Sequence, residues 1–159
     1  MTRRRSQRGA VLVELAVVIP VLVVLALGVI EIGLRAETSH TVVAATRAGA
    51  RVASSAADSR LADFDALQSI SGALADIDPA DVERIIIYRA VAADGALPPG
   101  CETTPQAGVC NHYSPASFSL TPSDFVTSGS RCGGTAPDYL WSPLQRNADP
   151  SGSPDWIGV

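Results

Sequence analysis

An apolar block from Ala10 to Ile30 constrains the fold of this chain more than any other feature of its sequence. The block has 21 residues and contains a single ionisable side chain, Glu14. At a rise of about 1.5 Å per residue, a helix of this length covers roughly 31 Å, which matches the hydrocarbon core of a bilayer. The sequence therefore predicts one membrane-spanning helix over residues 10–30.

The charges before this block predict its orientation. The first nine residues contain no acid but four basic side chains, Arg3, Arg4, Arg5 and Arg8. By the positive-inside rule they stay in the cytoplasm, so we expect a single-pass protein of the bacterial cytoplasmic membrane whose C-terminal part lies outside the cytoplasm. Beyond residue 9, 8 of the 12 basic residues face all 16 acidic ones. This balance argues against nucleic acid as a partner, because binding phosphates needs a basic surface.

A cleaved secretory signal peptide, followed by a secreted enzyme, is one alternative to a permanent anchor. Ala26-Leu27-Gly28 loosely fits a small-x-small cleavage site, and the arginines would form the basic start of such a peptide. The apolar block is longer than the usual core of a signal peptide, however, and it has a carboxylate near its start. These two features favour a retained helix.

Glu14 is the unusual residue of the block. A carboxylate in a spanning helix costs about 2.5–3.5 kcal/mol at the bilayer centre and less near the interface. Taken alone, Glu14 is best explained as a side chain one turn inside the membrane that reaches back to the headgroups.

The residues around Glu14 give it a second interpretation. The stretch from Arg8 to Glu14, RGAVLVE, resembles the processing site of type IV prepilins. In that family a prepilin peptidase cuts after the glycine, and a glutamate is the fifth residue of the mature chain. The resemblance implies a basic leader over residues 1–9, a cut between Gly9 and Ala10, and pairing of Glu14 with the new N-terminal amine of a neighbouring subunit.

A longer stretch, residues 8–55, resembles the TadE-like pilus-assembly proteins of tight-adherence (Flp-type) pilus systems. Four features carry the resemblance: the Gly-Ala-x-x-x-Glu start at Gly9, Pro20 in mid-helix, the Glu-x-Gly exit at Glu31, and an arginine-bearing stretch from Thr46 to Arg51. Thr46 departs from the usual alanine.

This second resemblance implies a function. We expect a minor pilin or pseudopilin that takes part in assembling a pilus for adhesion or surface attachment, either within the fibre or at the membrane. Its partners would be other pilins, the prepilin peptidase and membrane lipids; it would not be an enzyme and would need no cofactor or metal. The alternative is an unprocessed, membrane-anchored surface-binding module.

Residues 31–57 predict an extension of the helix beyond the membrane, since they contain no proline. Ala45, Gly49 and Ala53 form a row of small residues at helical spacing, which lets another helix approach closely. The row packs either on the protein's own domain or on another subunit. Within the spanning helix, Pro20 is expected to produce a kink.

Residues 58–159 predict a small, loop-rich domain, which makes the fold class α+β: a long N-terminal transmembrane helix extending into a domain with an amphipathic helix and a short antiparallel sheet. The strand is expected over Arg84–Ala92, followed by a turn at Asp94-Gly95, and a further strand starts at Asp155. TadE-like proteins commonly continue past this point, so the chain is either truncated or completes its sheet otherwise. The helix is expected before Pro79, with an apolar stripe of Leu61, Phe64, Leu67, Ile70, Leu74 and Ile77.

The chemistry-bearing side chains of this domain are sparse. Of three cysteines, Cys101 and Cys110 are the favoured disulfide pair if the domain lies outside the cytoplasm, which leaves Cys132 as an odd thiol. The two histidines are far apart and lack metal-ligand spacing. The four acids at Asp76, Asp78, Asp81 and Glu83 are expected to be solvated or to cap helices, and no catalytic motif is present.

Overall fold

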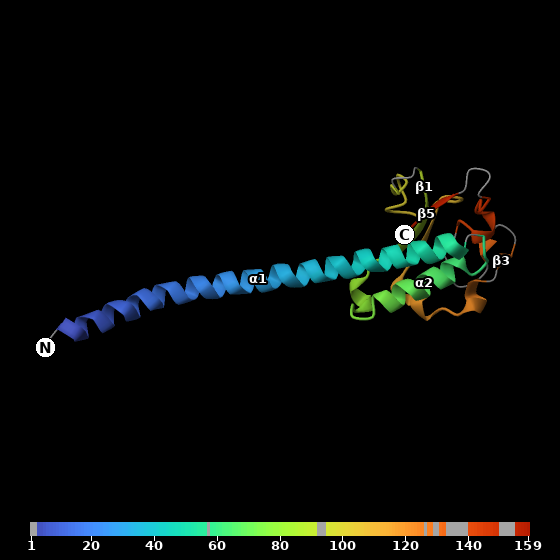
Figure 1. Cartoon of the computed structure of the whole chain (residues 1–159). Coiled ribbons are helices and arrows are strands. Elements are labelled where there is room, and N and C mark those ends of the chain that lie inside the picture. Colours follow the sequence, from blue (N-terminus) through green and yellow to red (C-terminus); the bar gives the residue numbers. More distant parts are fainter. Residues whose placement is uncertain are drawn as a thin grey trace. The chain divides into compact units, whose positions relative to one another are not determined.

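The computed structural model describes residues 3–56, 58–91, 95–125, 127–128, 131–132, 140–149 and 155–159 (Figure 1). For residues 3–10, 127–128 and 131–132 it describes the backbone only. The chain forms two compact units, Met1–His40 and Thr41–Val159. We call the second unit the C-terminal domain.

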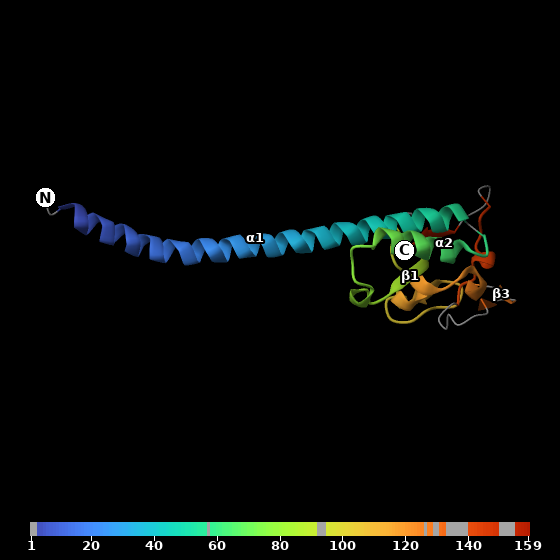
Figure 2. The same cartoon turned by 90° about the horizontal axis from the view of Figure 1, so that it is seen from below.

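Helix α1 (Arg3–Ala56) supplies all the described structure of the first unit and the first turns of the second. Pro20 lies inside α1, and Figure 2 shows that the N-terminal part of the helix is curved. The helix ends at Ala56, whose carbonyl oxygen accepts a hydrogen bond from the Ser59 amide (2.7 Å). Residues 31–56 are therefore helical, as predicted.

Helix α2 (Ala62–Ala73) runs back along the last turns of α1 within the C-terminal domain (Figures 1 and 2). Ala45 and Ala53 are buried, and Gly49 lies so close to Ile70 that a Cβ atom added at the glycine would stand 2.5 Å from Ile70 Cγ1. The row of small residues in α1 thus packs on the protein's own domain, which is the first of the two alternatives left by the sequence.

The predicted apolar stripe forms the centre of the core, although α2 ends at Ala73 and the last two residues of the stripe, Leu74 and Ile77, lie in the turns that follow it. Its buried members Leu67, Ile70 and Leu74 pack in one cluster with Ile85 and Ile87 of the sheet. The other three members, Leu61, Phe64 and Ile77, are half-buried against the same cluster. The stripe therefore faces the core of the protein's own domain.

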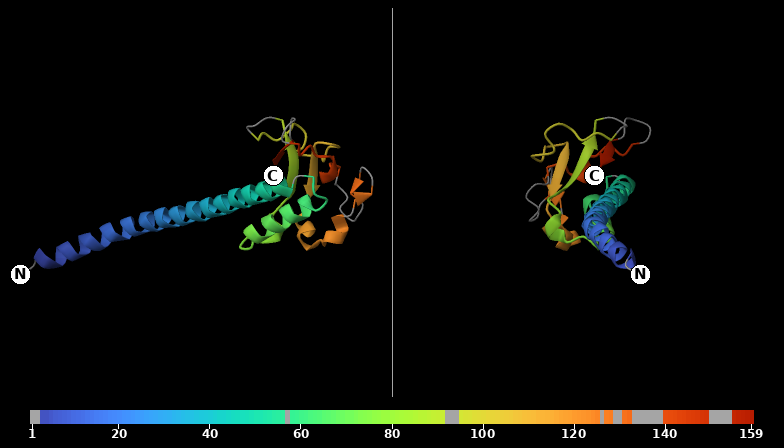
Figure 3. Two further views of the ribbon diagram at one scale, coloured as in Figure 1. Left: turned by 45° about the vertical axis from the view of Figure 1, so that its right-hand side comes forward. Right: turned by 90° about the vertical axis from the view of Figure 1, so that its left-hand side faces the viewer.

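A three-stranded antiparallel sheet packs against these helices (Figure 3). Strand β1 (Ile85–Ala90) is central, between β2 (Cys110–Tyr113) and β5 (Trp156–Gly158). Both predicted strands form, and the α+β fold class with a long N-terminal helix is confirmed. Asp94 of the predicted turn lies outside the described residues; Gly95 has a φ of 74°.

The rest of the domain consists of single turns, as its many prolines predict. Each of its 3₁₀ turns begins at a proline, whose fixed φ and missing N–H suit a first helical position. The remaining elements are η1 (Pro79–Asp81), η2 (Pro115–Ser119), η3 (Pro122–Phe125), η4 (Pro143–Gln145), β3 (Thr127–Ser128) and β4 (Arg131–Cys132).

The close approach of α1 and α2 leads to our first prediction, which concerns the stability of variants at two helical glycines. Gly49→Ala is expected to destabilise the domain by about 1–3 kcal/mol, because the buried Ile70 side chain must move away. Gly72→Ala is the matched control: no atom lies within 4 Å of its added Cβ, so a gain of roughly 0.5–1 kcal/mol is expected. Urea unfolding of the full chain in detergent measures both, and equal effects would contradict the close packing at Gly49.

Candidate assembly segment and its supporting domain

The first unit is a helix whose apolar side chains face outward all round. Its large hydrophobic residues from Val11 to Leu34 are 43–71% exposed. Soluble helices bury an apolar stripe, whereas a helix that is apolar on every side suits a bilayer. In the described part of the chain, α1 is the one helix long and apolar enough to span a membrane.

The predicted processing and pairing residues lie within two turns of α1, around the start of the apolar segment. Gly9 and Ala10 are consecutive residues within α1, and the structure describes only their backbone. Glu14 lies four residues after Ala10, about 6 Å along the helix axis. Its side chain is exposed and makes no hydrogen bond or ion pair with any described residue of the same chain.

At the end of the apolar segment, Glu31 is a carboxylate that has an ionic partner within the chain. Glu31 accepts a hydrogen bond from Arg35 Nη2, one turn further along α1, at 2.6 Å. Both side chains are largely exposed, so this pair contributes little to stability. Glu31 therefore has a partner within the chain, in contrast to Glu14, which has none among the described residues.

A disulfide between Cys101 and Cys110 links a surface loop to the first residue of β2. Both cysteines are buried, and they are the pair favoured by the sequence. Two hydrogen bonds hold the loop from outside: Arg84 Nη1 donates to the Glu102 carbonyl oxygen (2.8 Å), and His112 Nε2 lies 2.7 Å from the Cys101 carbonyl oxygen. The loop is thus tied to the central sheet. The side chain of Cys132 lies outside the described part of the structure.

Our second prediction concerns the contribution of this disulfide to stability. The double variant Cys101→Ser/Cys110→Ser is expected to lose about 2–4 kcal/mol of stability, because the unfolded chain regains the freedom of the opened loop. Urea unfolding with and without a reducing agent measures this. The reductant should destabilise the parent chain by the same amount and leave the double variant unchanged; a response of the variant to reductant would contradict the assignment.

A buried ion pair joins α2 to the C-terminal part of the domain. Arg146 Nη2 donates to Asp63 Oδ1 at 2.5 Å, and both side chains are at most 1% exposed. The other carboxylate oxygen of Asp63 accepts from Tyr113 Oη (2.7 Å) and Asn111 Nδ2 (2.9 Å). The guanidinium also lies 4.3 Å from the centre of the Trp141 ring, a cation–π contact.

Asn111 extends this network to the backbone of the C-terminal segment. Its Oδ1 accepts from the amides of Leu140 (2.8 Å) and Trp141 (2.6 Å), and its Nδ2 also donates to the Trp141 carbonyl oxygen (2.8 Å). We call Asp63, Asn111, Tyr113 and Arg146 the buried polar network. It holds residues 140–146 against β2 and α2, and so it fixes a segment that has little regular structure of its own.

The sequence prediction missed this network, although one signal for it was present. Asp63 shares the buried face of α2 with Ala66, Leu67 and Ile70, at spacings of three, four and seven residues. A carboxylate on an apolar helix face needs a partner, since an unpaired buried charge is strongly destabilising. The identity of that partner, 83 residues away, could not be read from the helix alone.

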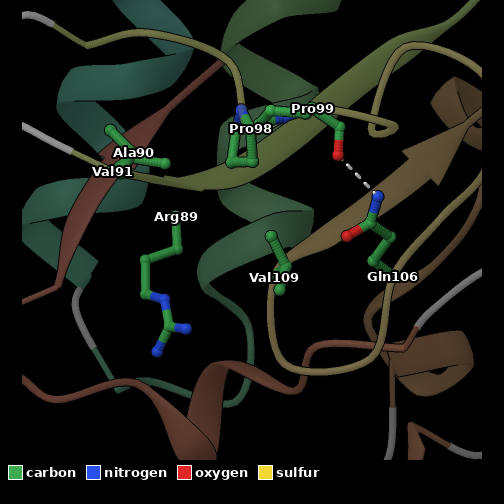
Figure 4. Close-up of a pocket in the computed structure, with 7 residues that line it drawn as sticks. All are labelled: Arg89, Ala90, Val91, Pro98, Pro99, Gln106 and Val109. Carbon is green, nitrogen blue, oxygen red and sulfur yellow. Dashed lines mark hydrogen bonds between the residues drawn. The ribbon is translucent and has the colours of Figure 1, made fainter.

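A pocket of about 420 Å³ opens beside the end of β1 (Figure 4). Arg89 is its one charged residue, and the Gln106 amide donates to the Pro99 carbonyl oxygen (2.9 Å) at its rim. The lining contains no histidine, cysteine or carboxylate, and within the described residues no three such side chains gather as metal ligands would.

The acids at Asp76, Asp78, Asp81 and Glu83 are all exposed, and Asp78 caps η1 as predicted.

These features define a class of protein: a single helix that suits a membrane, joined to a small α+β domain. The comparison with known families then places the chain more narrowly. A family model described as TadE-like protein matches residues 9–51. This N-terminal part of the chain is thus similar to the TadE-like proteins of the Tad pilus system, and it contains the apolar stretch of α1 that is long enough to span a membrane. No curated protein and no solved structure was found to match the chain.

Proposed function

We propose that this chain is a minor pilin or pseudopilin of a Tad (Flp-type) pilus, inserted in the bacterial cytoplasmic membrane and processed between Gly9 and Ala10. The chain is then a substrate of the prepilin peptidase and not itself an enzyme. The proposal is carried by Glu14, a carboxylate that lies within the stretch matched by the family model and has no partner among the described residues. It stands in a helix whose apolar surface is exposed.

The proposed chemistry follows from the position of Glu14. Cleavage leaves a protonated amine on Ala10, at the edge of the apolar segment, with the basic leader removed. An amine of a neighbouring subunit would pair with the Glu14 carboxylate and offset the cost of taking both charges out of water. The apolar faces of α1 then pack against other pilin helices as they leave the bilayer. We place the C-terminal domain outside the cytoplasm, where its disulfide is stable.

Processing is the third prediction and the test of this proposal. N-terminal sequencing of the chain from membranes that contain the cognate peptidase is expected to give Ala10 as the first residue. An intact Met1 or Thr2 would instead support an unprocessed anchor for a surface-binding module, and a start near Val29 would support secretion. A Gly9→Leu variant is the control, and it should retain its leader because the peptidase needs the small residue before the cut.

A further inference from the structure

Within the C-terminal domain, the face of α1 that points away from α2 and the sheet carries two arginines that no other described part of the chain covers. Arg47 and Arg51 are each two residues, about 200° of helical rotation, from members of the buried row Ala45, Gly49 and Ala53. Both are exposed and lie one turn apart, beside Val43, which is 42% exposed. We call Val43, Arg47 and Arg51 the basic face of α1.

The two arginines are available for an ionic partner. In the described part of the structure, no carboxylate lies within ion-pair distance of Arg47 or Arg51. A basic helix face of this kind is complementary to an acidic surface, because opposite potentials attract the partner and set its register.

An acidic surface occurs elsewhere on the same chain. Residues 76–83 follow α2 and hold four acids in eight residues. The backbone of this acidic loop is fixed, since Asp78 Oδ1 accepts from the Ala80 amide (2.9 Å) and its apolar members Ile77 and Val82 pack on the core. Glu83 pairs with Arg84, whereas the carboxylates of Asp76 and Asp81 stay exposed and have no partner among the described residues.

The two surfaces cannot meet within one molecule. Helix α2 packs on the side of α1 that carries Gly49, and the acidic loop continues from α2, whereas the basic face points the opposite way. The pairing has to be intermolecular. Since each copy carries both surfaces at different places, one copy contacts two neighbours through unlike patches, and such heterologous contacts build rings or filaments.

We propose that the basic face of α1 docks on the acidic loop of a second copy of this chain. The inference rests on the proposed assembly function and adds a contact between C-terminal domains to the packing of the apolar segments. Because the surfaces are exposed and charged, this contact weakens with salt, whereas packing of apolar helices does not.

Photo-crosslinking of the full chain tests the proposal. A benzophenone amino acid at Val43 leaves both arginines intact, and the chain is expressed together with the cognate prepilin peptidase in membranes of a host that has no other pilus proteins. We expect a crosslinked dimer whose junction maps to residues 76–83, with a yield that falls in high salt. The same probe at Val91, which is 74% exposed and follows β1, is the control and should give no such junction.

Charge reversal decides whether the arginines carry the contact. Arg47→Glu/Arg51→Glu and Asp76→Arg/Asp81→Arg are each expected to lower the dimer yield about tenfold or more, since like charges then face each other. The chain with all four changes should recover most of the yield. Equal yields in all variants, a crosslink elsewhere, or no self-crosslink in this host would each overturn the proposal. A correct Ala10 start in the same samples would leave the proposed function standing.

Discussion

Asp63→Asn is expected to destabilise the C-terminal domain by about 3–5 kcal/mol, because it leaves the Arg146 guanidinium buried without a counter-charge. Asparagine has the shape of aspartate but cannot replace it here. Three donor groups, from Arg146, Tyr113 and Asn111, converge on the two carboxylate oxygens. An amide offers one acceptor oxygen and turns its own donor toward the others.

A loss of this size is a large part of the stability of a small domain, which is typically about 5–15 kcal/mol in all. Urea unfolding of the full chain in detergent measures it, and Trp141 provides the signal because it is buried beside Arg146. The matched control is Asp65→Asn, an exposed carboxylate on the same helix, for which a change within about 0.5 kcal/mol is expected.

A double variant separates the ion pair from the rest of the network. Asp63→Leu/Arg146→Met contains no buried charge, so it should recover part of the loss seen with Asp63→Asn. The recovery should be incomplete, because Tyr113 and Asn111 still lack their shared acceptor. A double variant that is less stable than Asp63→Asn would show that the charges themselves are not the cause of the loss.

The network also shows where prediction from the sequence ends. The membrane helix, the apolar stripe and strand β1 could be predicted, because each is recognised from the apolar residues of one continuous stretch of sequence. Arg146 lies in a proline-rich segment with no period, and its contact with Asp63 exists only after the chain has closed on itself. The same limit applies to Ala45, Gly49 and Ala53, since a row of small residues permits close packing without specifying the helix that packs on it.

For residues 9–30, the apolar part of α1, the sequence is more informative than the fold. The resemblance that Gly9, Ala10, Glu14 and Pro20 carry is what predicts the role of this segment, and the fold adds that the apolar surface stays open around Glu14. No contact among the described residues explains why a carboxylate is placed there. Its proposed partner lies on another subunit, so the decisive measurement has to be made on the assembly.

Glu14→Gln is expected to leave cleavage after Gly9 intact and to lower incorporation into the pilus by about a hundredfold or more. The variant removes the charge that would balance the buried amine of a neighbouring subunit, and breaking one half of a buried ion pair costs about 3–5 kcal/mol. The amount of processed chain in the membrane should not fall, because glutamine is easier to insert in a bilayer than a carboxylate.

Two measurements on the same cells check this expectation: the N-terminal sequence of the membrane-bound chain, and its amount in sheared pilus fractions relative to the membrane. Glu31→Gln serves as the matched control. It removes a carboxylate from the same helix, but one that already pairs with Arg35 on an exposed surface, so incorporation should stay within about twofold. If Glu14→Gln were cleaved and assembled as well as Glu31→Gln, the pairing role of Glu14 would be excluded.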